Sequence, residues 1–227
     1  MIQFSNVSKI YNNEFSVLTD VSFSVAKGEF VFLTGESSSG KSTLLKHIYM
    51  DEFPTSGTVK VSTYDSDTIK KRDIPFLRRS LGIVFQDFRL LSDRSVFENI
   101  AFAMRVTGSH EHDVKSKVFE VLALTGLSHK ADFMPHQISG GEQQQVCIAR
   151  AIVNDPVLVL ADEPTGNLDS MVSKEIVALF EKINSLGTTV IMATYDKHFI
   201  AQYPHRTITL TKGRIAADTP ARERSTL

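Results

Sequence analysis

The sequence GESSSGKS, at residues 35–42, constrains the fold of this chain more than any other stretch. It follows a short apolar run, Phe30 to Thr34, and precedes a segment of helical character that starts at Lys41. A strand, a glycine-rich loop and a helix in this order let backbone amides close around the phosphates of a nucleotide. Lys41 would reach the β and γ phosphates, and the Ser42 hydroxyl would bind Mg²⁺. The loop therefore predicts a nucleotide-binding fold of the α/β class.

The rest of the chain alternates between strand-like and helix-like stretches. The alternating or short apolar patterns of strands occur at residues 2–4, 21–25, 83–85, 157–161 and 189–193. Between residues 87 and 154 the apolar residues recur mainly at helical spacing, and a further helical stretch occupies residues 171–183. Turns are predicted at residues 27–28 and 55–57, where glycine occurs. Strands that alternate with helices predict a largely parallel sheet.

Composition narrows the class of protein. A chain of 227 residues, 42% of them hydrophobic, can bury a core as one large domain or two small ones. The formal net charge of −1 gives no support for nucleic-acid binding. Cys147 is the only cysteine, which excludes an internal disulfide and a zinc site built from cysteines. The sequence shows no secretion leader and no apolar run long enough to span a membrane, so we expect membrane contact only through a partner protein.

Two further motifs carry polar groups that suit a bound nucleotide. The stretch SGGEQ at residues 139–143 is placed to open a helix, and helix starts bind anions. The apolar run at 157–161 leads straight into Asp162 and Glu163. At the end of a strand beside the phosphate loop, Asp162 can hold Mg²⁺ and Glu163 can polarise an attacking water. These motifs predict a nucleotide hydrolase.

In this order the motifs resemble those of the ATP-binding cassette (ABC) ATPases. The run DEPTGNLD at residues 162–169 resembles the Walker B motif and D-loop of that family, and residues 138–145 resemble its signature. The resemblance implies a P-loop NTPase fold with a RecA-like core, an antiparallel β subdomain and an inserted helical subdomain. We accordingly expect one domain over residues 1–227, with the core at 1–86 and 155–220, the helical subdomain at 87–154 and a loose tail at 221–227. The resemblance also implies a homodimer, in which ATP lies between the phosphate loop of one copy and the signature of the other.

The resemblance gives each site residue an expected role, with ATP and Mg²⁺ as cofactors. The adenine ring would stack on Tyr11, and Ser139 would contact the γ-phosphate held by the other copy. The residues implied in nucleotide binding are Tyr11, Gly35, Glu36, Ser37, Ser38, Ser39, Gly40, Lys41, Ser42, Thr43, Ser139, Gly140, Gly141, Glu142 and Asp169. Those implied in Mg²⁺ binding are Ser42, Gln86 and Asp162. Those implied in catalysis are Lys41, Gln86, Glu163 and Tyr195, and Gln86 would also sense the membrane partner.

Three positions depart from the usual residues of the family. Ser38 stands where glycine is usual, and a positive φ at a serine would cost about 1 kcal/mol or more. Gln145 replaces an arginine at the end of the signature. Tyr195 replaces the histidine that contacts the γ-phosphate and orients the water, although a tyrosine hydroxyl can donate one hydrogen bond. Because Lys41 and Glu163 remain, we predict slow or partner-dependent hydrolysis rather than its loss.

Within the family, DEPTGNLD is typical of ATPases that serve membrane proteins of the FtsX and MacB type. The segments at 74–79, 85–87, 90–91 and 93–94 resemble the cell-division group named FtsE. This resemblance implies a peripheral protein on the cytoplasmic face of the bacterial inner membrane, docked to an FtsX-like permease through residues 86–91. Closure of the dimer on ATP would signal through that permease to cell-wall hydrolases.

Other functions stay open on the sequence. The chain could instead serve a lipoprotein-releasing or macrolide-exporting complex, because those ATPases share much of the same sequence. The departures at residues 38, 145 and 195 could also mark a nucleotide-gated scaffold that binds ATP with little hydrolysis. A DNA-repair or chromosome ABC ATPase is disfavoured, because the stretch from Gln86 to Ser139 has no room for a long coiled coil and the cysteines of a zinc module are absent.

Overall fold

Five consecutive buried residues form β3 (Phe30–Thr34), the strand that leads into the glycine-rich loop. Strands covered on both faces read as uninterrupted apolar runs, which is why the sequence FVFLT predicted this one. The computed structural model describes residues 1–12 and 14–222, so most of the predicted tail, 221–227, lies outside the described residues. The chain divides into two compact units: Met1–Arg78 together with the chain from Thr189 onward, and Arg79–Thr188. The phosphate loop belongs to the first unit, and the signature and the carboxylate pair belong to the second.

In the first unit, β3 is the centre of a parallel arrangement. It pairs in parallel with β8 (Thr189–Thr194) and with β9 (Arg206–Thr211), and β9 pairs antiparallel with β10 (Arg214–Thr219). All six residues of β8 are buried, as are the five of β3. The register sets Thr34 opposite Thr194, so the loop after β3 and the residues after β8 leave the sheet at the same edge. The sequence-based prediction of parallel strands is confirmed here.

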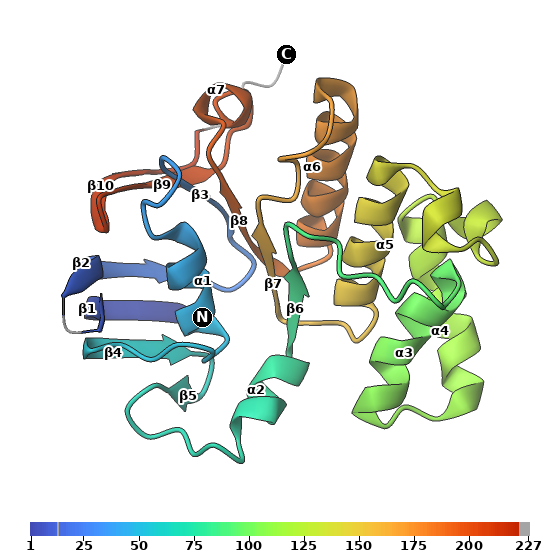
Figure 1. The fold of residues 1–227 in the computed structure, drawn as a ribbon, viewed down its shortest axis with the longest axis horizontal. Coiled ribbons are helices and arrows are strands. Elements are labelled where there is room, and N and C mark those ends of the chain that lie inside the picture. The colour runs from blue at the N-terminus through green and yellow to red at the C-terminus, as the bar shows by residue number, and fades with distance from the viewer. Residues whose placement is uncertain (13, 223–227) are drawn as a thin grey trace. The chain divides into compact units, whose positions relative to one another are not determined.

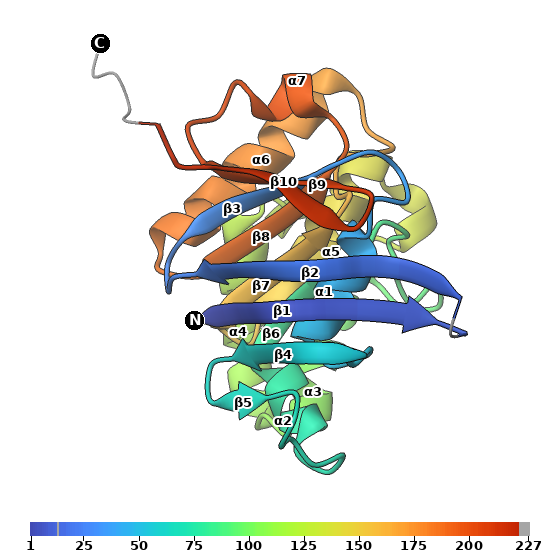
Figure 2. The same ribbon diagram turned by 90° about the vertical axis from the view of Figure 1, so that its left-hand side faces the viewer.

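An antiparallel sheet, in the strand order β2-β1-β4-β5, completes the first unit. Figure 2 views these strands from the side on which α1 lies behind them. The helix α1 packs against β2 and β4 and buries Leu44, Leu45 and Ile48. The elements of this part are β1 (Ile2–Tyr11), β2 (Phe15–Val25), α1 (Lys41–Ile48), β4 (Ser56–Val61) and β5 (Tyr64–Asp65). The short helices α2 (Ile74–Arg79) and α7 (Lys197–Ile200) follow β5 and β8 in the chain.

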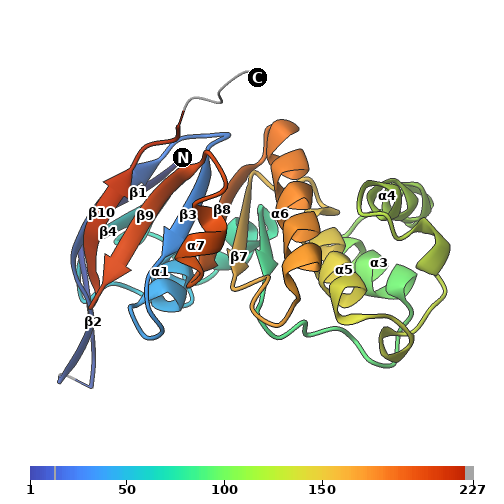
Figure 3. The same cartoon turned by 90° about the horizontal axis from the view of Figure 1, so that it is seen from above.

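The second unit combines two parallel strands with four helices. The strand β6 (Leu81–Val84) pairs in parallel with β7 (Leu158–Asp162). The helix α5 contacts α3, α4, α6 and β6, and it lies between α6 and the α3–α4 pair in Figures 1 and 3. The helices are α3 (Val96–Thr107), α4 (Glu111–Leu124), α5 (Gly140–Ile152) and α6 (Ser170–Ser185), with 3-10 turns at Ser128–Lys130 and Pro135–Gln137. The central place of α5 matters because this helix begins at the signature.

Several predicted boundaries were wrong by a few residues. The turn predicted through Gly57 is instead the start of β4, where the backbone of Asn6 on β1 approaches so closely that a side chain would not fit. The strand β6 ends at Val84, its last residue paired with β7, so Gln86 follows the strand by two residues.

Candidate nucleotide-binding site

The phosphate loop folds around the side chain of Lys41. The Lys41 ammonium donates hydrogen bonds to the carbonyl oxygens of Gly35, at 2.9 Å, and Glu36, at 3.2 Å. Lys41 is only 6% exposed, so its positive charge is held largely out of water inside the loop. Buried charges interact strongly with ligands of opposite sign because screening by water is weak. The loop is therefore a preformed site for an anion.

Two glycines of the loop leave no room for a side chain. A Cβ at Gly35 would clash with the Leu210 carbonyl and would lie 2.5 Å from the Ser39 hydroxyl. At Gly40, where φ is 105°, a Cβ would lie 2.8 Å from a methyl group of Leu18. The Ser39 hydroxyl is buried, and none of the described residues forms a hydrogen bond with it. Leaving such a group unpaired costs about 1–3 kcal/mol, a cost that a bound phosphate oxygen or water would remove. The loop thus fits a phosphate group.

Ser38 adopts the strained backbone conformation that its sequence position suggested. Its φ is 65°, in the left-handed region that favours glycine. We expect Ser38→Gly to raise the free energy of unfolding by about 0.5–1 kcal/mol, because glycine removes the Cβ contact with its own backbone. Urea unfolding measures the change. The matched control is Ser37→Gly, at a residue without positive φ, which should lower stability instead; a gain in both variants would contradict the assignment of strain to Ser38.

Tyr195 lies close to the loop in the fold. Thr34 and Thr194 are paired neighbours, so Gly35 and Tyr195 both begin at the same edge of the sheet. Tyr195 is 52% exposed, and the next residue, Asp196, caps α7 by accepting a hydrogen bond from the Phe199 amide at 2.8 Å. The cap fixes the backbone just after Tyr195. The structure therefore brings the predicted switch residue and the predicted phosphate loop together within one unit.

The signature forms a capping box at the start of α5. The Glu142 amide donates to the Ser139 hydroxyl at 3.3 Å, and the Ser139 amide donates to the Glu142 carboxylate at 2.8 Å. The Ser139 hydroxyl also donates to that carboxylate, at 3.0 Å, and Lys130 lies 3.4 Å from it. The pKa of the Glu142 carboxyl is lowered, chiefly because the carboxylate accepts a hydrogen bond from the Ser139 backbone amide. An anion is therefore already at this helix start, supplied by the protein itself.

The two glycines of the signature serve different contacts. A Cβ at Gly141 would lie 2.6 Å from a methyl group of Val172, so the absence of a side chain lets α5 approach α6. A Cβ at Gly140 would meet only Leu168, at an ordinary 3.8 Å. Packing within the second unit thus explains Gly141 and leaves Gly140 unexplained. A glycine without an internal packing reason is consistent with close approach by a ligand or partner.

The carboxylate pair lies where β7 ends. Asp162 is the last residue of β7, and Glu163 follows it with a φ of 48°. For a non-glycine residue, this backbone conformation costs about 1–3 kcal/mol of strain, and residues that adopt it cluster at functional sites. A turn follows, in which the Gly166 amide donates to the Glu163 carbonyl at 3.2 Å. Asp169 caps α6 by accepting from the amides of Met171, at 2.9 Å, and Val172, at 3.0 Å. The carboxylate of Asp169 therefore has a structural role in the chain itself.

Gln86 is exposed, and the loop that follows it is fastened to the signature helix. The Phe88 carbonyl accepts from the Cys147 thiol at 2.9 Å and from the Arg150 guanidinium at 3.0 Å. The guanidinium also donates to the Arg89 carbonyl at 2.7 Å. Burial raises the pKa of Cys147 to about 12, so the thiol remains protonated and able to donate. Arg150 is a contact that the sequence motifs did not point to, since its partners lie about 60 residues away.

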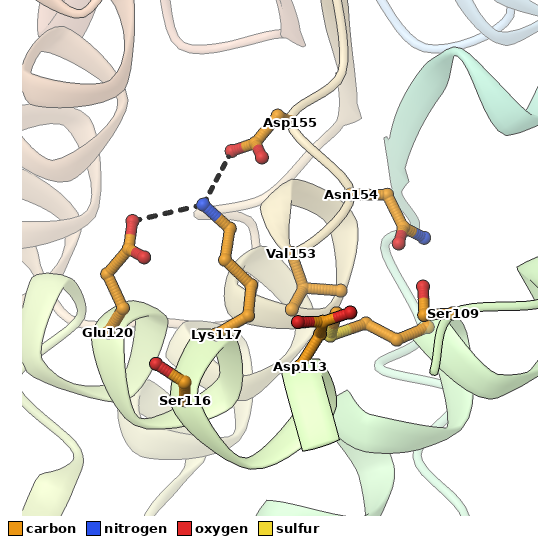
Figure 4. A pocket seen from close by; sticks show the side chains of 9 residues that line it. Ser109, Asp113, Ser116, Lys117, Glu120, Val153, Asn154 and Asp155 are labelled. Carbon is orange, nitrogen blue, oxygen red and sulfur yellow. Dashed lines mark hydrogen bonds and ion pairs between the residues drawn. The ribbon is translucent and has the colours of Figure 1, made fainter. Parts of the chain in front are cut away.

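A shallow groove in the second unit has the wrong charge for a nucleotide. It encloses about 410 Å³ beside the start of α4 and the residues that follow α5. Figure 4 shows Lys117 reaching both Glu120, at 3.0 Å, and Asp155, at 2.9 Å. Asp113 adds a third carboxylate, so acidic groups outnumber the one ammonium. None of the residues predicted to bind nucleotide lines this groove.

Comparison with known proteins agrees with the motifs. A family model described as "ABC transporter" matches residues 18–166. The chain is 48% identical over 218 residues to the cell division ATP-binding protein FtsE of Bacillus subtilis, covering 96% of each chain. It superimposes with a TM-score of 0.87 on the dimeric structure of MJ0796, a bacterial ABC transporter cassette, at 33% identity over 98% of this chain and 99% of that one. A post-hydrolysis state of MJ0796 bound to ADP and Pi matches with a TM-score of 0.86 at 32% identity, with the same coverage.

No helix in the described part of the chain has the length and apolar character that crossing a membrane requires. The predicted fold class is confirmed by the match to solved ABC cassettes along nearly the whole chain. ATP binding and hydrolysis are the activity that this family carries out. The buried lysine, the glycine loop and the two carboxylates at the end of β7 supply suitable groups for it. The chain belongs to the ABC transporter family of ATPases.

Proposed function

We propose that this protein is the ATP-binding subunit of an FtsEX-like complex, in which two copies dock beneath an FtsX-like membrane protein. The observation that carries the proposal is the 48% identity to a cell division ATP-binding protein along 96% of both chains. Closure of the two copies on ATP would move the membrane protein and so control cell-wall hydrolases. The site would lie at the cytoplasmic face of the bacterial inner membrane.

Each group of site residues has a role in this proposal. The loop from Gly35 to Thr43 holds the phosphates, with the Lys41 ammonium as its buried counter-charge. Mg²⁺ would be held by Ser42, Gln86 and Asp162 and would neutralise charge on the phosphate oxygens. Among the described residues, no group of three or more His, Cys, Asp or Glu side chains is arranged to hold a metal ion. Glu163 accepts the proton of the attacking water.

The signature would act on the nucleotide of the second copy. A homodimer is supported by the solved relative whose structure is described as dimeric. In this chain Ser139, Gly140, Gly141 and Glu142 begin α5, and Gly140 carries no packing constraint of its own. The γ-phosphate would approach there, where helix amides and the Ser139 hydroxyl are present. Because Ser139 already donates to Glu142, that hydroxyl must turn away from the carboxylate to donate to a phosphate.

The loop after Gln86 is the proposed contact for the membrane protein. Phe85, Phe88, Leu90 and Leu91 are each partly exposed, which leaves apolar surface for a partner. Arg150 connects the same loop to α5 through hydrogen bonds. A displacement of the loop would therefore be transmitted to the helix that begins at the signature. This connection supports a role in transmitting movement between ATP and the membrane.

A second candidate function is a nucleotide-gated scaffold with little hydrolysis. It is favoured by the exposed Tyr195 at the edge beside Gly35, where the family usually has histidine. Among functions that use ATP hydrolysis, the alternative is the ATPase of a lipoprotein-releasing or macrolide-exporting complex. Solubilised membranes from the native cell should yield an FtsX-like membrane protein when this chain is affinity-purified with ATP, and that protein should stimulate phosphate release. Recovery of a lipoprotein-release or macrolide-export permease instead would refute the proposed partner, and partner-bound protein without phosphate release would favour the scaffold.

Tyr195→His is expected to raise ATP turnover by about tenfold, because one added transition-state hydrogen bond is worth about 1.4 kcal/mol. Imidazole is shorter than phenol and can orient both the water and the phosphate. Steady-state phosphate release from the purified chain measures the change. Tyr203→His, in the same unit but after α7, is the matched control and should leave turnover unchanged. Equal turnover in Tyr195→His and the native chain would show that this position does not limit the rate.

A further inference from the structure

We propose that Lys9, held by Glu52, fixes the ring of Tyr11 and thereby positions the adenine base of the nucleotide. This inference rests on the proposed stacking of adenine on Tyr11 and adds two residues to that part of the site. Lys9, Tyr11 and Glu52 all belong to the first unit, as does the phosphate loop. Neither Lys9 nor Glu52 belongs to the motifs by which the site was recognised.

Lys9 lies over the face of the Tyr11 ring. Its ammonium is 4.9 Å from the ring centroid, within the range at which a cation is attracted to an aromatic face. The two residues are two apart on β1, which places their side chains on the same face of the strand. The pairing of β1 with β2 shifts register on both sides of Lys9, and such bulges re-aim the side chains of a strand.

The Lys9 ammonium is itself fixed by two further contacts. It forms an ion pair with the Glu52 carboxylate at 2.6 Å and donates to the Phe53 carbonyl at 2.9 Å. Its side chain is only 14% exposed, so the pair is partly shielded from water and salt. The pKa of Glu52 is lowered, first by its hydrogen bond with Lys9. Lys9 therefore stays in place over the ring rather than moving as a free surface lysine would.

Glu52 lies near Tyr11 as well as near Lys9. Burial raises the pKa of the Tyr11 hydroxyl, the nearby Glu52 carboxylate raises it further, and the Thr43 hydroxyl partly offsets this. Thr43 is the residue next to Ser42 at the start of α1. Tyr11 therefore lies near Glu52 and near the helix that leaves the phosphate loop.

The arrangement leaves a single ring face for a base. Lys9 covers one face of Tyr11, so a purine would stack on the other. The cation draws the ring's electron density toward itself, which favours an electron-rich purine on the open face. Ordering the ring before binding also lowers the entropy lost when the base stacks. Lys9 is in this sense a positioning residue, since it acts on the base through Tyr11.

The test compares binding of a non-hydrolysable ATP analogue with binding of inorganic triphosphate, both with Mg²⁺, by calorimetry on the full chain. Lys9→Met keeps the aliphatic stem and removes the charge. The change should weaken binding of the ATP analogue by about five- to tenfold. The affinity for triphosphate should stay within about twofold of the native value. Lys9→Arg, which retains a cation, should restore most of the analogue's affinity. Lys60→Met, at an exposed residue on β4, is the control for loss of one positive charge and should change neither affinity.

The outcomes separate this inference from the proposed stacking. If Tyr11→Ala leaves the ratio of the two affinities unchanged, adenine does not stack on Tyr11 and both ideas fail. If Tyr11→Ala lowers the ratio but Lys9→Met does not, the stacking stands and the role of Lys9 is overturned. If Lys9→Met weakens binding of both ligands equally, the role of Lys9 is also overturned, because an equal loss indicates a general effect of charge or of structure. Should Lys9→Met fold poorly, Glu52→Gln provides the same comparison, since it removes the charge that holds the Lys9 ammonium in place.

Discussion

Glu163→Gln is expected to lower ATP turnover by about 10²–10⁴-fold, the usual contribution of a general base. The amide has the size of the carboxylate but cannot accept the proton of the attacking water. Glutamine meets the same steric cost as glutamate at the φ of 48° found here, so the turn after β7 should be retained. Steady-state phosphate release measures the loss. Nucleotide affinity should stay within about threefold, because the Lys41 loop that holds the phosphates is unchanged.

Glu175→Gln is the matched control for this change. Glu175 is an exposed glutamate on α6, outside the predicted site, so its loss should leave turnover as in the native chain. Both variants should unfold within about 0.5 kcal/mol of the native protein, as exposed or isosteric changes usually do. If Glu163→Gln kept native turnover, another group would be the base. If the native chain itself showed no turnover that Glu163→Gln could remove, the scaffold function would be favoured.

The phosphate loop and its setting could be predicted because the signals are local. The apolar run of β3, the two glycines and Lys41 lie close together in the sequence, and each has a direct steric or electrostatic reason in the fold. The expectation of strain at Ser38 was confirmed by its φ of 65°. Local chemistry thus fixes this part of the site almost completely.

The capping box has a local signal in the sequence, although it was not among the predictions made from the motifs. Serine followed three residues later by glutamate, as at Ser139 and Glu142, is the sequence signature of a capping box, and both of its hydrogen bonds form in the structure. The carboxylate of Asp169 likewise caps α6. A residue predicted to bind a ligand can therefore also cap a helix of its own chain, and the resemblance to a ligand-binding motif does not by itself point to that second role.

Long-range contacts were beyond sequence reasoning altogether. Arg150 binds carbonyl groups about 60 residues earlier, and the ion pair of Lys9 with Glu52 joins β1 to the chain after α1. Neither contact has a periodic or motif-like signature, because a carbonyl acceptor exists at every residue. These contacts surround the motifs and fix their geometry, so they determine properties that motif matching cannot supply.

Lys41→Met is expected to weaken ATP binding by at least about 100-fold, or about 2.7 kcal/mol. Methionine fills a similar volume but removes the buried ammonium, and with it the charge-assisted hydrogen bonds that a phosphate would receive. Calorimetry measures the affinity, and ATP should raise the melting temperature of the native chain but not of the variant. Lys60→Met, an exposed lysine paired with Asp65 at 3.5 Å, is the matched control and should bind as the native chain does. The Gly35 and Glu36 carbonyls lose their donor in Lys41→Met, so a folded variant whose affinity falls by less than threefold would show that the lysine closes the loop rather than binding phosphate.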